Sequence, residues 1–238
     1  FKSLYLVAIL LGLGVDAAQA AAAAPWVDKK PVRYRLVTAE VAGQAYVALQ
    51  LQLKPGWHTY WRYPGASGIA PEFRFNASGG GKIGAAIFPA PHFFDDGVGG
   101  FYGYEGETGF VFPMQAKPGT MVKLESLLGV CREVCIPFEI RETLVLPTNG
   151  GSNPQHKQVI ANLLAAQATP ENAALRVARV SFDGVSLQVV VTGQDLKTPY
   201  VMSVPGPHDI LGPPRTAARH PAAHLIEIPA WSKLDHPL

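Results

Sequence analysis

The strongest constraint on the fold is a segment in which apolar and more polar side chains alternate with a period of two. In residues 44–53, one face carries four aliphatic side chains, Val47, Leu49, Leu51 and Leu53. The other face carries Tyr46, Ala48, Gln50 and Gln52. A period of two is typical of a strand that buries one face and exposes the other, so this segment predicts half of an antiparallel pair.

Further short runs follow the same pattern, each bounded by Gly, Pro or Asn. They span residues 33–41, 57–61, 72–75, 82–88, 109–114, 122–130 and 138–146. Glycine and proline, 24 and 21 of the 238 residues, supply many turns and argue against a helical bundle. The chain is therefore expected to be all-β, with an immunoglobulin-like sandwich over residues 26–147.

The composition changes after Pro147, where turn-forming residues begin a linker that we place at residues 148–174. Within it, Asn153 as cap and Pro154 as first helical residue predict a short helix that ends before Pro170. Alternation returns at residues 177–182 and 185–192, which predicts a second β domain over residues 175–238. No closing strand is evident after these runs, so we expect this second domain to be truncated.

The amino terminus has the features of an export signal. Lys2 precedes an apolar run from Leu4 to Val15, and Ala18-Gln19-Ala20 then supplies a small-x-small cleavage pattern. The apolar run is too short to span a bilayer comfortably. We expect residues 1–22 to be a signal peptide and the mature protein to be exported.

Charge and composition exclude two classes of protein. Hydrophobic residues make up 48% of the chain and the formal net charge is only +2, which excludes a disordered chain. No basic run or basic-aromatic stripe is present, so nucleic acid is not an expected partner.

The two cysteines, Cys131 and Cys135, are separated by three residues. On one straight strand their Cα atoms would lie roughly 13 Å apart, about twice the span of a disulfide. The segment must therefore turn if the sulfurs are to meet. Either a hairpin with the loop Arg132-Glu133-Val134 or one helical turn would bring them together.

A disulfide that closes so small a loop removes little entropy from the unfolded chain, so stability is a poor reason for it. Three functions remain open. The pair could exchange disulfides without a cofactor, or bind Cu(I) with His58 or Met114 as a third ligand. The third alternative is an inert β-sandwich interaction module with a local disulfide.

Several sequence blocks together resemble a known family. They are Gly56-Trp57-His58-Thr59-Tyr60-Trp61, Tyr63-Pro64-Gly65, Tyr102-Gly103-Tyr104-Glu105-Gly106-Glu107 and Val130-Cys131-Arg132-Glu133-Val134-Cys135-Ile136-Pro137. Over residues 30–147 the chain resembles the amino-terminal periplasmic domain of the DsbD-type protein-disulfide reductases. The three-residue cysteine gap is most similar to the branch of suppressor of copper sensitivity protein B. Phe88 and Leu128 depart from this pattern, because tryptophans are expected at these positions.

The resemblance implies an immunoglobulin-like domain with a redox-active cysteine pair that acts as a protein-disulfide reductase. It further implies a location in the periplasm, with electrons supplied by a membrane-embedded domain of the same full-length chain, anchored in the inner membrane. Thioredoxin-like periplasmic proteins are the implied partners, and cytochrome c-type biogenesis and copper tolerance are the associated processes. Cys135 is the implied attacking sulfur and Cys131 the resolving one.

The resemblance also implies a loop that caps the cysteines and moves aside for a partner. The candidates are Phe93, Phe94, Phe101, Tyr102 and Tyr104, with core packing as the alternative for each. Glu105 and Glu107 either assist proton transfer or are simply solvated.

Three histidines complete the candidate residues. His58 is either a structural strand residue or a metal ligand. His220 and His224 have the spacing of metal ligands on a helix, but the nearby Pro214 and Pro221 argue against a helix there.

Overall fold

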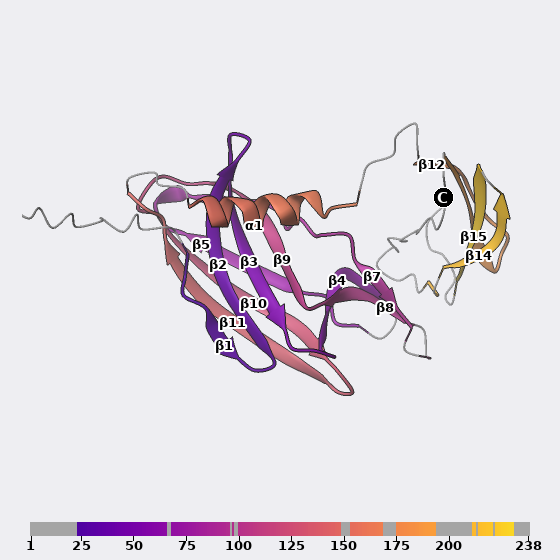
Figure 1. The fold of residues 1–238 in the computed structure, drawn as a ribbon, viewed down its shortest axis with the longest axis horizontal. Helices are drawn as coiled ribbons and strands as arrows, with labels where there is room; N and C mark the ends of the chain where they lie inside the picture. Colours follow the sequence, from indigo (N-terminus) through magenta and orange to yellow (C-terminus); the bar gives the residue numbers. More distant parts are fainter. Residues whose placement is uncertain are drawn as a thin grey trace, which may run out of the picture.

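The protein is described by a computed structural model (Figure 1). The described residues are 23–65, 68–95, 97, 100–148, 153–168, 175–193, 211–212, 214–220 and 222–230. The expected signal peptide, residues 1–22, lies outside them. Among the described residues, no helix is both long enough and apolar enough to cross a membrane.

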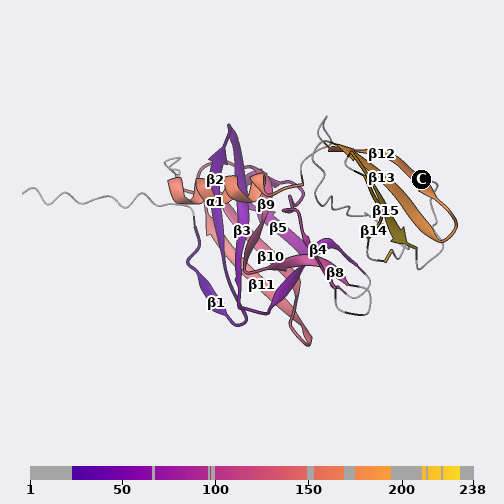
Figure 2. The same ribbon diagram turned by 45° about the vertical axis from the view of Figure 1, so that its right-hand side comes forward.

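The first domain is a sandwich of two antiparallel sheets, which confirms the predicted all-β, immunoglobulin-like fold (Figures 1 and 2). The first sheet contains, in order, β1 (Val27–Lys29), β2 (Val32–Val41), β3 (Gln44–Leu53), β9 (Glu107–Gln115) and β6 (Lys82–Ile83). The second sheet contains, in order, β11 (Cys135–Val145), β10 (Met121–Cys131), β4 (His58–Gly65), β8 (Phe101–Glu105) and β7 (His92–Phe94). A further strand, β5 (Glu72–Ala77), pairs with β10, and a 3-10 turn at Ser78–Gly80 follows it.

The core between the sheets is built from the inward faces predicted by the alternation. Val47, Leu49 and Leu51 on β3 are fully buried against Leu128 and Ile140 of the second sheet. Burying each such side chain contributes about 1.5–3 kcal/mol. Because side chains alternate along each strand, the second sheet also has an outer face whose side chains take no part in this core.

The predicted helix is confirmed as α1 (Pro154–Ala165). The Asn153 side chain caps it by accepting a hydrogen bond from the backbone N–H of Gln155 at 2.8 Å. The helix lies across the outer face of the first sheet, where Ile160 is buried against Val37 and Val111 (Figure 2).

The strand predictions for the first domain were wrong for one predicted run and missed three strands. The predicted run 82–88 is a strand only at Lys82–Ile83, with an isolated bridge at Ile87, and Gly84 interrupts the segment. Strands β1, β7 and β8 were missed. In β8, four successive residues are buried, so no alternation marks it as a strand.

The second domain contains a four-stranded antiparallel sheet in the order β12 (Leu175–Phe182), β13 (Ser186–Gly193), β15 (Ala223–Pro229) and β14 (Arg215–His220). The expectation that no strand follows residue 192 was wrong, because β15 pairs directly with β13. The buried face of β15 consists of His224, Ile226 and Ile228. The histidine in this face interrupts the alternation of apolar residues by which a strand is recognised from the sequence.

His220 and His224 lie on neighbouring strands joined by a turn, with His224 paired to Arg219. The helical spacing considered for a metal site is therefore absent. The predicted truncation of this domain remains a prediction.

One buried histidine under α1 predicts a pH dependence of stability. His156 is 5% exposed, its Nδ1 has no hydrogen-bond partner, and burial lowers its pKa, with nearby Arg35 adding to the effect. The unfolded chain therefore binds a proton more readily than the folded one as the pH falls below about 6.5. Stability should be lost as the pH falls from there through the lower folded pKa.

We expect His156→Met to reduce this loss without abolishing it, because His58 has a pKa that burial also lowers. Urea unfolding from about pH 7 to about pH 5 measures the difference. Lys157→Met, on the same helical turn but exposed, is the control and should keep the wild-type profile. An unchanged profile in the His156 variant would contradict the prediction.

Candidate functional site

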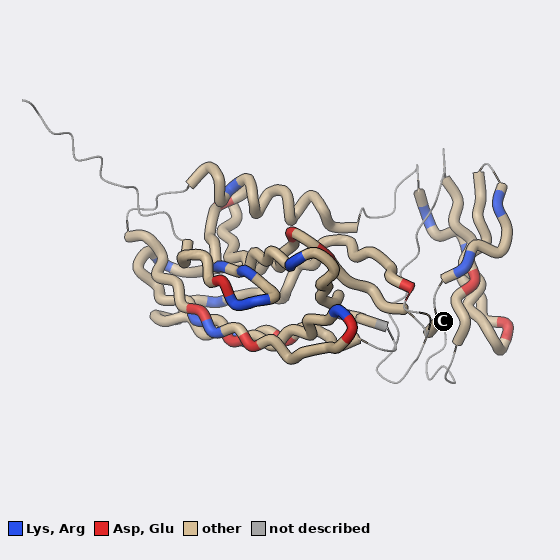
Figure 3. The backbone as a smooth tube through the Cα atoms, turned by 60° about the horizontal axis from the view of Figure 1, so that its bottom comes forward, with Lys and Arg blue, Asp and Glu red and all other residues tan. Residues whose placement is uncertain are grey.

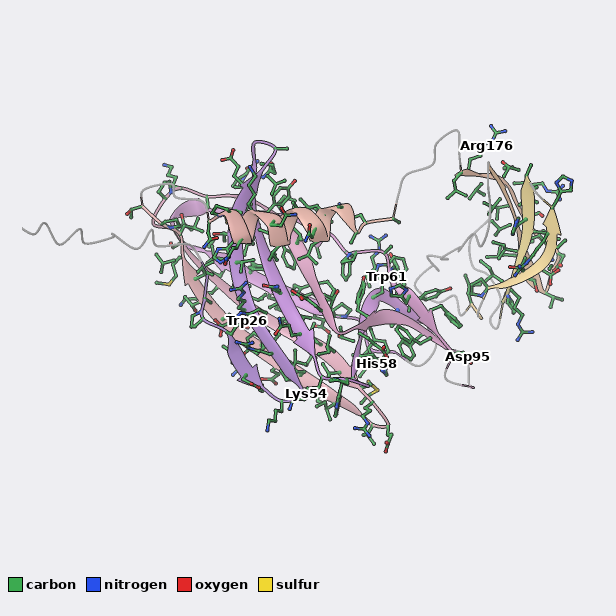
Figure 4. The ribbon with its side chains drawn as sticks, viewed as in Figure 1. Trp26, Lys54, His58, Trp61, Asp95 and Arg176 are labelled. Atoms are coloured by element: carbon green, nitrogen blue, oxygen red, sulfur yellow. A yellow bond between two sulfur atoms is a disulfide. The ribbon has the colours of Figure 1, made fainter. Side chains whose placement is uncertain are left out.

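The two cysteines form a disulfide at the end of the β10–β11 hairpin (Figure 4). Cys131 is the last residue of β10 and Cys135 the first of β11, and the two are directly paired in the ladder. Their Cα atoms are 4.0 Å apart and their sulfurs 2.01 Å apart. Of the two geometries left open by the spacing, the three-residue hairpin loop is the one observed.

The two sulfur-bearing residues differ in accessibility. Cys131 is 2% exposed and belongs to a small buried cluster, whereas Cys135 is exposed. Its neighbour in the loop, Val134, is 73% exposed. A second protein can therefore reach Cys135 from solvent, whereas Cys131 is covered.

A tyrosine hydroxyl contacts both sulfurs. The Tyr60 hydroxyl donates to Cys131 Sγ at 2.9 Å and lies 3.2 Å from Cys135 Sγ. Its ring is held between two glycines: an added Cβ would lie 2.9 Å from the ring at Gly129 and 2.7 Å from it at Gly68. Any larger residue at either position would displace the ring and its hydroxyl.

The register of three strands arranges the outer face of the second sheet around the disulfide. Cys131 on β10 pairs with His58 on β4, and His58 pairs with Glu105 on β8. Paired residues point to the same face, so these three side chains form one row across the sheet. The His58 ring stacks on Phe101 with centroids 4.2 Å apart, and Phe101 stacks on Phe94 at 4.9 Å.

Of the five aromatic residues considered for the cap, Phe101 and Phe94 lie beside the cysteines. Phe101 belongs to the buried cluster that contains Tyr60 and Cys131, and Phe94 packs against it. Phe93 instead packs on Tyr102 at the sandwich core. Tyr102 and Tyr104 point to the opposite face of β8 and pack in the sandwich core. The Tyr104 hydroxyl donates to the carbonyl of Pro89 at 2.8 Å, and burial raises the pKa of Tyr104. For these two tyrosines the structure matches the core-packing alternative.

The two glutamates considered for proton transfer are also separated. Glu105 is exposed and pairs with His58, whose pKa burial lowers while the carboxylate partly opposes that effect. Glu107 lies on the first sheet, where it accepts a hydrogen bond from Gln50 at 2.7 Å. Gln50 in turn accepts from Arg35 at 2.9 Å. Glu107 is therefore engaged in a polar chain of the other sheet.

The fold separates the two residues considered as a third Cu(I) ligand. His58 lies beside Cys131, but Met114 is buried in the core on β9, where it pairs with Ile83 of β6. Across the part of the chain that the structure describes, no group of three or more His, Cys, Asp or Glu side chains could hold a metal ion.

One contributor to the site was missed from the sequence, Tyr60. It stood within a recognised sequence block, but nothing in that block indicated that its hydroxyl reaches sulfurs more than seventy residues away. Phe94 was among the cap candidates, although the strand that carries it, β7, was not predicted; it lies opposite Phe101.

A disulfide between one exposed and one buried cysteine, held at the end of a hairpin on a β-sandwich, is the arrangement that thiol–disulfide exchange requires. The family described as "Thiol:disulfide interchange protein DsbD, N-terminal" matches residues 29–147, and the chain belongs to this family. This confirms the resemblance stated from the sequence.

A solved structure has the same fold. It is the crystal structure of the N-terminal periplasmic domain of ScsB from Proteus mirabilis, with a TM-score of 0.71 and 21% sequence identity. The alignment covers 92% of this chain and 90% of that chain. Among curated proteins, none matches the chain significantly.

The contact between Tyr60 and the sulfurs predicts a measurable effect on thiol reactivity. A hydroxyl that donates to a thiolate stabilises the charged form, and such hydrogen bonds are worth about 1.5–3 kcal/mol. We expect Tyr60→Phe to slow alkylation of the reduced pair by about tenfold at neutral pH and to move its onset to higher pH.

Iodoacetamide labelling followed by mass spectrometry across the pH range measures this effect. Tyr63→Phe is the matched control, because Tyr63 lies on the same strand but packs against Trp61. Equal alkylation profiles for wild type and Tyr60→Phe would show that the hydroxyl does not act on the thiolate.

Proposed function

We propose that this chain is the periplasmic domain of a protein-disulfide reductase that passes electrons to oxidised partner proteins through Cys131 and Cys135. The observation that supports it is the disulfide between an exposed and a buried cysteine in a member of the DsbD amino-terminal family. A loop this small contributes little to stability, so the bond can open and close without a large cost to the fold.

The reaction begins with the reduced pair. The Cys135 thiolate attacks a sulfur of the partner's disulfide, a new bond forms between the proteins, and the partner's other sulfur leaves with the electron pair and takes up a proton. Cys131 then loses its proton and attacks Cys135 Sγ. The intermolecular bond breaks, the partner departs as a dithiol, and the Cys131–Cys135 disulfide is left oxidised by two electrons.

The two cysteines take these roles because of their surroundings. The attacking thiol has to be reached by another protein, and Cys135 is the exposed member of the pair. The resolving thiol has only to reach Cys135, and Cys131 lies opposite it in the ladder. Tyr60 donates to whichever sulfur carries negative charge during the exchange.

The next reaction cycle requires a reductant for the Cys131–Cys135 disulfide. A membrane-embedded dithiol domain of the full-length chain, anchored in the inner membrane, supplies two electrons by the reverse exchange. Thioredoxin-like periplasmic proteins receive them, which connects the domain to cytochrome c-type biogenesis. Export by a signal peptide at residues 1–22 places the domain in the periplasm.

Trapping of a mixed disulfide tests the assignment of the two sulfurs. In Cys131→Ser this chain supplies no resolving thiol, and a thioredoxin with its second active-site cysteine replaced by serine supplies none either. We therefore expect the reduced variant to accumulate a covalent complex with this thioredoxin when its remaining cysteine is activated as a mixed disulfide with thionitrobenzoate, which leaves as the free thiolate. Cys135→Ser should trap none, and both variants should remain folded. Non-reducing electrophoresis and intact mass identify the complex, with the double serine variant as control.

Trapping only through Cys131 would reverse the two roles. Absence of any complex, together with tight Cu(I) binding that needs both cysteines, would replace the exchange function by copper binding.

The reduction potential tests the exchange function against an inert structural role. We expect the pair to equilibrate with a graded glutathione buffer in the range of known exchange proteins, about −120 to −270 mV. Quantifying the oxidised fraction by thiol labelling and mass spectrometry gives the value. A potential below about −300 mV would identify a structural disulfide.

A further inference from the structure

The surface around Cys135 carries apolar side chains that the exchange chemistry itself does not use. Val134 is 73% exposed and Ile69 is 40% exposed. Pro137, two residues after Cys135 on β11, is also exposed. We refer to Ile69, Val134 and Pro137 as the apolar collar.

The ladder places the collar on the same outer face as the disulfide. Pro137 shares this face with Cys135 because the two are two residues apart on one strand, and it pairs with Gly129 on β10. Ile69 lies over Gly129, where an added Cβ would approach the Ile69 Cβ to 2.7 Å. Val134 precedes Cys135 in the hairpin loop. The collar therefore extends over the outer face of the sheet from the hairpin loop to Gly129 on β10.

The charges next to the collar compensate each other. Arg132 and Glu133, both exposed in the hairpin loop, form an ion pair with a 3.5 Å separation. Figure 3 shows charges of both signs interspersed along the strands of this domain. The hairpin loop beside the reactive sulfur thus offers exposed apolar contacts and a compensated ion pair, while the exposed Glu105, in the same row as Cys131, adds a negative charge farther along the sheet.

We propose that the apolar collar is the docking surface for the substrate protein, and that this substrate carries an accessible disulfide surrounded by uncharged, apolar side chains. The proposal rests on the proposed exchange function. A mixed disulfide holds its two Cα atoms within about 4.4–6.8 Å, so a partner bonded to Cys135 must cover the adjacent Val134. Burying the collar then supplies affinity that does not depend on charge.

Two substitutions remove collar contacts without touching the sulfurs, Val134→Ala and Ile69→Ala. We expect each to lower kcat/KM for reduction of oxidised thioredoxin, used as the protein probe with excess dithiothreitol to re-reduce the pair and with the uncatalysed rate subtracted, by about fivefold or more. Reduction of glutathione disulfide should be unchanged, because this small disulfide needs only the sulfur.

Matched controls come from equally exposed valines elsewhere. Val145→Ala changes a 54% exposed residue at the other end of β11, and Val185→Ala changes a 70% exposed residue in the second domain. Neither should alter either rate. Because the measurement compares two substrates on the same variant, it separates docking from any effect on thiol chemistry.

The other outcomes overturn either the docking surface or the exchange function. Equal losses with both substrates, or no loss with thioredoxin, would overturn the collar as a docking surface. A wild-type chain that reduces glutathione disulfide but not thioredoxin would do the same. A chain that reduces neither substrate would instead overturn the exchange function.

Salt dependence provides an independent test. The Debye length falls from about 30 Å at 0.01 M salt to about 3 Å at 1 M, so recognition by charge would weaken strongly over that range. We expect kcat/KM with thioredoxin to change by less than about threefold. A steep fall would show that charge, and not the collar, directs docking.

Discussion

The register of the β10–β11 ladder is the constraint on which both the site and the core depend. It runs unbroken from Met121 paired with Val145 to Cys131 paired with Cys135. A slip of one residue would move every side chain of one strand to the opposite face. Such a slip would separate the sulfurs and at the same time expose Leu128 of the core. The redox pair and the sandwich core are therefore specified by the same set of backbone hydrogen bonds.

The same division between faces explains how neighbouring residues of β4 and β8 come to have different roles. On β4, Tyr60 contacts the sulfurs while Trp61, the next residue, packs in the core. On β8, Phe101 stacks beside the disulfide while Tyr102 points inward. Because successive side chains point to opposite faces, β4 and β8 contribute to the site on one face of the sheet and to the hydrophobic core on the other. The glycine at position 129 completes the arrangement, since it leaves room for the Tyr60 ring.

Those features that depend on local chemistry were predictable from the sequence. The period of two in residues 44–53 identified the core face of β3, and Asn153 with Pro154 identified the start of α1. Cysteine spacing limited the pair to a hairpin or a helical turn. Features that arise from contacts between distant strands were not predictable. Neither the position of Tyr60 between two glycines nor the commitment of Glu107 to Gln50 has a local signature.

The small size of the loop closed by the disulfide also has a thermodynamic consequence. Linkage is reciprocal: if the bond adds little to the stability of the fold, the fold adds equally little to the tendency of the bond to form. Ten further residue pairs of the ladder, from Val130 with Ile136 to Met121 with Val145, hold the hairpin together besides the pair that the disulfide joins. The reduction potential of the pair therefore depends little on conditions that lower the stability of the sandwich. At a given pH, a loss of sandwich stability would therefore leave the redox poise of the pair unchanged until the ladder itself melts.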